Sequence, residues 1–198
     1  HNTVTEVGAT VTWTDNSGNE SGYEIEVYTY GASPVGTATH TAAANTTSKV
    51  ITTLDPAQHY SFVIRAVDSG LAIGSSWAGT DDFTTDPLGI PTTLNATSVT
   101  DTTASLSWTD NSTSNDAFDI ELVLYGDSFT GTPTDSLNVG DTPYAATGLT
   151  PLTQYKFQVR ATKDGTFTSD WSSSNSFTTD TASSGGNTAL GYFVKGRR

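Results

Sequence analysis

Cysteine is absent from this 198-residue chain, and its 8 lysine and arginine residues are outnumbered by 21 aspartate and glutamate residues. Without cysteine there is no disulfide framework, thiolate metal site or cysteine nucleophile. The net charge of −13 argues against nucleic acid and anionic membranes as main partners, because phosphate groups are bound by basic patches. No apolar run is long enough to span a membrane, so we expect no membrane insertion.

The motifs of the common enzyme classes are also missing. The sequence contains no G-x-S-x-G nucleophile elbow, no H-E-x-x-H zinc motif and no glycine-rich loop that would cradle a phosphate. Its three histidines, His1, His40 and His59, are scattered along the chain. We therefore expect no enzymatic activity and no cofactor.

An internal repeat organises what is present. ATVTWTDNSGNESGYEIEV (9–27) aligns with ASLSWTDNSTSNDAFDIEL (104–122), and LDPAQHYSFVIRAVDSG (54–70) aligns with LTPLTQYKFQVRATKDG (149–165). The offset is 95 residues in both segments and falls to 94 from Trp77 to the end of the first unit. A nearly constant offset predicts two similar structural units followed by a tail.

Each unit has the pattern of a β-sandwich. The stretches VTW, YEIEV, KVITTL and YSFVIRAV alternate apolar and polar residues, and turn-forming Asp, Asn, Gly and Pro cluster between them. No segment has an apolar stripe of helical period. Strands at intervals of about 8–12 residues over roughly 90 residues predict an all-β fold with two sandwiches in tandem.

Both units resemble fibronectin type III domains. Trp13 and Trp108 match the core tryptophan of that family, and LDPAQHY and LTPLTQY match its tyrosine corner through Tyr60 and Tyr155. The resemblance implies immunoglobulin-like sandwiches in an extracellular structural or adhesive protein. The WTDNS stretches and the lack of cysteine are more similar to bacterial members, and without an RGD motif integrin binding is not implied.

The first predicted domain lacks most of its first strand. The predicted organisation is a first domain at 1–86, a second domain at 90–180, and a tail at 181–198. The repeat aligns Val4 with Val99, so the counterparts of Ile90 and Leu94 are missing from the first domain. A missing edge strand leaves backbone groups without partners and uncovers part of the core.

The tail has the pattern of such a strand. It contains three of the eight basic residues and no acidic one, so it carries +3, whereas the body has 5 basic and 21 acidic residues and carries −16. We expect the tail to be a donor strand that completes the first domain of the next copy, and such a head-to-tail contact forms a filament when it does not close. The expected interface residues are Leu190, Tyr192, Phe193, Val194 and Lys195 of the tail and Val4 of the first domain.

Other interpretations of the tail remain open. It either folds back on its own chain or leads into a domain outside this sequence. The chain begins at His1 without methionine or a signal peptide, which favours a processed protein or a fragment. Its richness in threonine, serine and asparagine favours an exported protein, either secreted or on the cell surface.

Oxygen-rich loops after the two tryptophans contain candidate calcium ligands, with Asx turns as the alternative. These candidates are Asp15, Asn16, Asp110 and Asn111. Four N-x-S/T sequons are candidate glycosylation sites. They lie at Asn19, Asn45, Asn95 and Asn111.

Aromatic and acidic side chains offer two further patterns. Tyr28, Tyr30, Tyr125 and Phe129 are candidates for stacking on sugars, with a role in covering strand edges as the alternative. Glu24 and Glu26 recur as Asp119 and Glu121. We expect these carboxylates on the solvent face of a strand, since the alternate residues are apolar.

The leading predicted function is a non-enzymatic extracellular structural or adhesive subunit that polymerises through its tail. One alternative is a spacer, or a pair of weak carbohydrate-binding modules, from a larger secreted polysaccharide-degrading enzyme. Another is a receptor-like or phage-associated binding module. The expected partners are further copies of the chain, with surface glycans or cell-surface proteins as adhesion targets.

Overall fold

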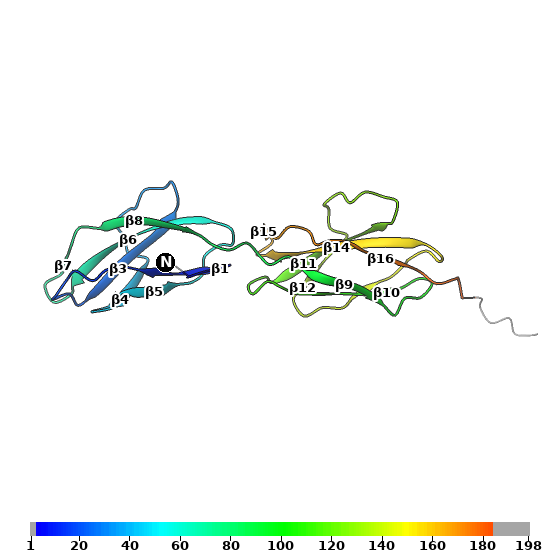
Figure 1. Ribbon diagram of the computed structural model, residues 1–198, viewed down its shortest axis with the longest axis horizontal. Coiled ribbons are helices and arrows are strands. Elements are labelled where there is room, and N and C mark those ends of the chain that lie inside the picture. Colours follow the sequence, from blue (N-terminus) through cyan, green and yellow to red (C-terminus); the bar gives the residue numbers. More distant parts are fainter. Residues whose placement is uncertain (1–2, 184–198) are drawn as a thin grey trace, which may run out of the picture.

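The computed structural model describes residues 3–183 and forms two β-sandwiches that lie end to end (Figure 1). The first domain contains β1 (Thr3–Thr5), β2 (Gly8–Thr12), β3 (Gly22–Thr29), β4 (His40–Ala43), β5 (Ser48–Ile51), β6 (His59–Asp68), β7 (Ile73–Gly74) and β8 (Ala78–Thr84). The second contains β9 (Thr92–Thr97), β10 (Ala104–Thr109), β11 (Ala117–Leu124), β12 (Asp135–Asn138), β13 (Tyr144–Ala146), β14 (Gln154–Lys163), β15 (Phe167–Thr168) and β16 (Asn175–Thr178). The described residues include no helix, and the predicted all-β class is confirmed.

A three-stranded and a five-stranded antiparallel sheet face each other in each domain. The first domain has the orders β1-β2-β5 and β4-β3-β6-β7, with β8 also paired to β6. The second has β9-β10-β13 and β12-β11-β14-β15, with β16 also paired to β14. The two topologies correspond strand for strand, as the sequence repeat predicts.

Alternate residues of the strands fill the space between the sheets. Val11 and Ile25 in the first domain, and Leu106 and Ile120 at the repeat-equivalent positions of the second, have no exposed surface. This period-two burial is the pattern expected of strands with one face on the core.

The tyrosine corners are present in both domains. The hydroxyl of Tyr60 accepts a hydrogen bond from the backbone N–H of Asp55, and the hydroxyl of Tyr155 accepts one from the N–H of Thr150, each at 3.0 Å. Each ring stacks on a phenylalanine of the last strand of its domain, with centroids 5.9 Å apart. The corner therefore fastens the turn before β6 or β14 to the core.

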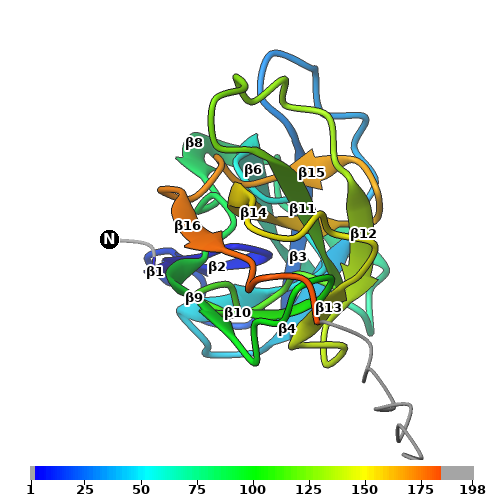
Figure 2. The ribbon, with the colours of Figure 1, turned by 90° about the vertical axis from the view of Figure 1, so that its right-hand side faces the viewer.

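The expectation that the carboxylates of β3 and β11 face solvent is wrong for three of the four. Glu26, Asp119 and Glu121 are only 2%, 8% and 2% exposed. The loops that follow β3 and β11 project to the same side of the molecule and account for the burial of the glutamates (Figure 2). Glu26 accepts backbone N–H bonds at 2.6 and 2.8 Å from its loop, and Glu121 accepts two in the same way at 2.6 and 3.1 Å.

Candidate interface on the first domain

A buried carboxylate joins the two domains. Glu6 lies in the tight turn between β1 and β2, where Thr5 pairs with Gly8, and it is 8% exposed. Its Oε1 accepts a 2.9 Å bond from the backbone N–H of Gly89, in the linker. Its Oε2 accepts bonds of 2.7–3.1 Å from the second domain, donated by the hydroxyls of Ser112, Thr113 and Ser114 and by the backbone N–H of Thr113. We call this set of residues the joint.

The charge of Glu6 is stabilised by these donors. Burial alone raises the pKa of the Glu6 carboxyl. The bonds from Ser114, Thr113, Ser112 and Gly89 outweigh burial and hold the pKa below its usual range. The carboxylate is therefore ionised at neutral pH, and charge-assisted bonds of this kind are about twice as strong as neutral ones.

The linker is fastened onto the second domain at the same place. Leu88 is 3% exposed and belongs to the core of the second domain. A Cβ atom on Gly89 would overlap the backbone carbonyl of Asn111, so only glycine fits there. The side-chain amide of Asn111 donates to the carbonyl of Ile90 at 2.7 Å and to the hydroxyl of Thr92 at 2.9 Å. The linker thus binds the loop after Trp108 and contributes Leu88 to the core of the second domain.

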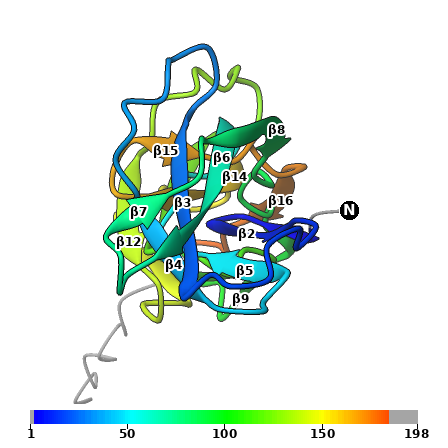
Figure 3. The same ribbon diagram turned by 90° about the vertical axis from the view of Figure 1, so that its left-hand side faces the viewer.

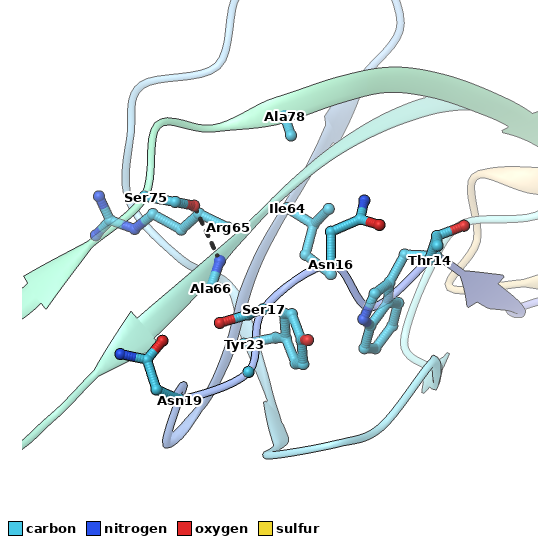
Figure 4. A pocket seen from close by; sticks show the side chains of 12 residues that line it. Thr14, Asn16, Ser17, Asn19, Tyr23, Ile64, Arg65, Ala66, Ser75 and Ala78 are labelled. Carbon is cyan, nitrogen blue, oxygen red and sulfur yellow. Dashed lines mark hydrogen bonds between the residues drawn. The ribbon is translucent and has the colours of Figure 1, made fainter.

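The equivalent region of the first domain is a hollow of about 410 Å³. Its lining residues come from the loop after β2, from β3, β6 and β8, and from the segment between β7 and β8. Figure 4 shows Asn16 beside Ile64, with Ala78 on the strand above. Trp13 and Tyr23 form one side, with their ring centroids 5.2 Å apart.

Three apolar residues of the hollow are more exposed than their repeat counterparts. They are Ile64, Ala66 and Ala78. Their counterparts Val159, Ala161 and Ser172 are only 0%, 0% and 6% exposed, whereas Ile64 and Ala66 are half-buried and Ala78 is exposed. The hollow is therefore a part of the first core that lacks the cover found in the second domain.

The edge of the three-stranded sheet is also less completely paired in the first domain than in the second. Within residues 3–183, β1 pairs with β2 over three residues, from Gly8 to Thr10. The longer β9 pairs with β10 from Ser105 to Thr109, with one irregularity. The backbone of β2 beyond Thr10 therefore has no strand partner on its outer side in this part of the chain.

Tyr23 places a polar atom beside the hollow. Its hydroxyl is buried and has no hydrogen-bond partner among the described residues, and its repeat counterpart Phe118 has no hydroxyl. Burial raises the pKa of Tyr23 to about 12, and the nearby Asp15 carboxylate adds to the rise. The indole nitrogens of Trp13 and Trp108 also have no partner in the described structure, so they do not distinguish the two domains.

A carboxylate also occupies the far end of the second domain. Asp101 is the repeat counterpart of Glu6, and it accepts a 2.9 Å bond from the backbone N–H of Ser183. Ser183 is in turn the counterpart of Gly89. The bond from Ser183 lowers the pKa of the Asp101 carboxyl. In each domain, an acidic residue in the first turn therefore binds the backbone of the segment that follows the last strand.

The candidate calcium loops form turns. Oδ1 of Asp15 accepts the backbone N–H of Ser17 at 3.0 Å, and Oδ1 of Asp110 accepts that of Ser112 at 2.9 Å. These are Asx turns, the alternative given by the sequence. Across residues 3–183 no group of three or more His, Cys, Asp or Glu side chains is placed to hold a metal ion.

The four sequons lie in different settings. Asn19 and Asn95 are exposed, on the loop after β2 and on β9. Asn45 has a positive φ of 58° and its N–H bonds to Glu20 at 2.9 Å. The amide of Asn111 is engaged with the linker, as described above.

The sugar-stacking candidates are divided between the two domains. Tyr30 is 60% exposed and stacks on His59, with centroids 3.8 Å apart. Tyr125 is 52% exposed, and the ammonium group of Lys156 lies over the ring of Phe129 at 4.8 Å.

Sequence reasoning named Val4 but missed the joint. Val4 is half-buried in β1 and packs on the first core. The predicted interface residues of the tail lie outside the described residues: Leu190, Tyr192, Phe193, Val194 and Lys195. Glu6, Gly89 and Asp101 were not predicted, although the repeat holds a signal for two of them, an acidic residue at the same turn position of both units.

Known proteins share this architecture. A family model described as fibronectin type III domain matches residues 1–77 and 89–178. A two-domain fibronectin type III segment of chicken tenascin is similar over 90% of this chain and 97% of its own, with a TM-score of 0.52 and 17% identity. The FN1–FN3 domains of chicken CNTN1 are similar over 89% of this chain and 64% of their own, with a TM-score of 0.44 and 17% identity. No curated protein matches the sequence. No helix in the described part of the chain could cross a membrane.

Proposed function

The chain belongs to the fibronectin type III family, and from this premise we propose that it is an extracellular structural or adhesive subunit that assembles head-to-tail into filaments. Tandem domains of this family suggest a structural or adhesive module, and they are typically non-catalytic. In the proposed assembly, the tail of one copy is added as a strand to the first domain of the next. This mode of assembly is strand addition to a sheet edge.

The uncovered hollow is the observation that carries the proposal. Ile64, Ala66 and Ala78 line it, and the second domain buries the equivalent positions. Two of these, Val159 and Ala161, belong to the same core as Leu88 of the linker. The adjacent outer edge of β2 beyond Thr10 offers backbone donors and acceptors to an added strand. One extended segment with apolar side chains would both fill the hollow and pair with this edge of β2.

Charge favours the tail as that segment. The tail carries +3 and no acidic residue, and the body carries −16 from 5 basic and 21 acidic residues. Asp15 lies in the loop beside the hollow, and Glu20 and Asp68 line a second hollow next to it at the same end of the domain. The guanidinium of Arg65, which also lines the hollow, is already paired with Glu24 at 2.6 Å. A basic tail is therefore drawn to this end of an acidic molecule.

Geometry favours insertion into a neighbouring copy over folding back. The loop from Ser17 to Glu20 lies beside β7, at the end of the first domain away from the second (Figure 1). Ser183 lies at the opposite end of the molecule, bonded to Asp101. The seven residues from Ser183 to Leu190 reach at most about 25 Å. Strands β6 and β14 alone are each about 33 Å long and lie one after the other, so the tether is too short to return to the hollow.

Sedimentation of two forms of the chain tests the proposal. The full chain should form large species whose size rises with concentration, and a version ending at Ser183 should remain monomeric. The shorter version retains every strand and core residue of the described structure, so both forms should give the same circular dichroism spectrum. If both forms stay monomeric at every concentration, the proposal fails and the spacer alternative takes its place.

A further inference from the structure

We infer that the contact between copies repeats the joint between the two domains of one chain, with Leu190 and Gly191 in the places of Leu88 and Gly89. This inference rests on the proposed function and names the register and the acceptor residues of the added strand. It also predicts a second contact, between Asp101 of the donor copy and the loop at Ser17 of the acceptor.

The tail repeats the linker in sequence. The Leu-Gly dipeptide occurs at two places in the chain, 88–89 and 190–191. Each follows an FTTD motif that closes a domain, at 83–86 and 177–180. A large side chain comes next in both cases, Ile90 in the linker and Tyr192 in the tail. The linker before the second domain and the tail after it therefore contain the same Leu-Gly dipeptide.

The structure gives both residues of the dipeptide a physical role. Leu88 is buried in the core of the second domain, at 3% exposure, and Gly89 passes so close to the carbonyl of Asn111 that no side chain fits. The counterpart of Asn111 in the first domain is Asn16, which lines the hollow (Figure 4). In the described part of the chain the Asn16 amide makes no hydrogen bond. A segment that supplies leucine and then glycine fits both the open volume and the close approach.

The acidic partner of the joint is also repeated. Glu6 binds the N–H of Gly89 and the hydroxyl of Ser112, and Asp101 already binds the N–H of Ser183. The counterpart of Ser112 is Ser17, on the loop after β2, and it lines a hollow together with Ile73 and Gly74 of β7. Figure 3 shows β7 at the free end of the first domain. When two copies meet end to end, Asp101 faces this loop as Glu6 faces residues 112–114, and the N–H of Gly191 replaces that of Ser183 as its backbone donor.

The contact between copies is weaker than the joint it repeats. Thr113 and Ser114 correspond to Gly18 and Asn19, so two of the hydroxyl donors to the carboxylate are absent. Asp101 is also one methylene shorter than Glu6. The linker has only Pro87 between its FTTD motif and Leu88, whereas nine residues separate Asp180 from Leu190. A longer tether and fewer bonds make a reversible contact rather than a rigid one.

Disulfide trapping in the full chain tests the register. Thr92, whose hydroxyl is 2.9 Å from the amide of Asn111, lies four residues after Leu88, and Val194 lies four residues after Leu190. Asn16→Cys combined with Val194→Cys should therefore form an intermolecular disulfide, and the natural chain has no cysteine to compete. Mild oxidation of assembled material should give a ladder of covalent multimers on a non-reducing gel.

Two matched pairs serve as controls. Asn16→Cys with Lys195→Cys shifts the tail by one residue and turns the thiol to the other face of the strand. Asn111→Cys with Val194→Cys places the thiol on the loop that already binds the linker. Each should give at least about tenfold less multimer than the Asn16–Val194 pair, a difference of about 1.4 kcal/mol if trapping follows the equilibrium population.

The outcomes separate this inference from the proposed function. A ladder strongest for the Asn16–Val194 pair supports the register. Chains that assemble in sedimentation but trap equally well, or better, through either control pair overturn the inference and leave the filament proposal standing. Chains that never assemble, or that form only an internal disulfide within a monomer, overturn both.

Discussion

The hydroxyl of Ser114 donates a 2.7 Å hydrogen bond to Oε2 of Glu6, across the boundary between the two domains. These residues are 108 positions apart, and the carboxylate that receives the bond is 8% exposed. Together with the bond from Gly89 to Oε1, it fixes both the linker and the second domain to one turn of the first domain. The two domains are therefore set in line by one ionised side chain.

Replacing Glu6 with glutamine should loosen the joint. The carboxylate accepts five hydrogen bonds, and a glutamine amide would aim its NH₂ group at donors that need an acceptor. We expect a loss of about 1–3 kcal/mol in stability and faster proteolysis at the linker. Thermal unfolding and limited proteolysis measure these changes. Glu20→Gln is the control, because Glu20 lies away from the joint, on the loop after β2, and accepts the backbone N–H of Asn45 within its own domain, so it should change neither readout.

Acid should weaken the contact between Glu6 and the second domain. The pKa of Glu6 is lower in the folded chain than its ordinary value of 4.5, so its stabilising contribution is complete above pH 4.5. That contribution is lost as the pH falls through the folded pKa. Small-angle scattering from pH 6 to pH 3 should show the domains losing their fixed alignment at the acid end. Glu6→Gln should already be loosened at pH 6, and an acid response identical to that of the parent chain would contradict the assignment.

Gly89→Ala should destabilise the second domain. The new Cβ atom would overlap the carbonyl of Asn111, and the backbone must shift to admit it. Overpacking of this kind costs about 1–3 kcal/mol, measured here by urea denaturation. Gly126→Ala is the matched control, because a Cβ at Gly126 meets nothing within 4 Å. Equal effects of the two substitutions would show that the linker is not closely seated.

Gly191→Ala should weaken assembly by the same reasoning. If Gly191 takes the place of Gly89, its added methyl group meets the loop at Asn16 of the acceptor copy. Sedimentation should show at least a tenfold rise in the concentration needed for assembly, with no change in the unfolding of the monomer. Gly186→Ala, in the tether, should have no effect on either measurement.

Two tyrosine-to-phenylalanine changes should act in opposite directions. Tyr23→Phe removes a buried hydroxyl that has no partner within residues 3–183 and should stabilise the first domain by up to about 1 kcal/mol. Tyr60→Phe removes the acceptor for the N–H of Asp55 and should destabilise it by about 1–3 kcal/mol. Thermal unfolding of the two variants distinguishes them. A destabilising Tyr23→Phe would mean that this hydroxyl has a partner in solution.

The sandwiches could be predicted because their signals are local and occur twice. Trp13, Trp108 and the two tyrosine corners recur at an offset of 95 residues, and alternation along each strand marks its buried face. The burial of Glu26 and Glu121 could not be predicted in this way. Their faces are covered by loops whose path is set by the bonds to those same carboxylates.

The joint depends on contacts that no local pattern contains. Glu6 meets Ser114 only because β1, β2 and the linker place one turn against a loop of the other domain. The repeat indicated that the first domain lacks part of a strand. Comparison of Ile64 with Val159, and of Ala78 with Ser172, was needed to locate the uncovered core.

Electron microscopy of the full chain with a competing tail peptide tests the central claim most directly. Negatively stained samples alone should contain filaments built from two-domain units. An excess of the peptide NTALGYFVKGRR, residues 187–198, should reduce them to single particles by occupying the hollow. The same peptide with Leu190→Asp should leave the filaments intact. Single particles without any peptide, or filaments that survive the natural peptide, would contradict assembly through the tail.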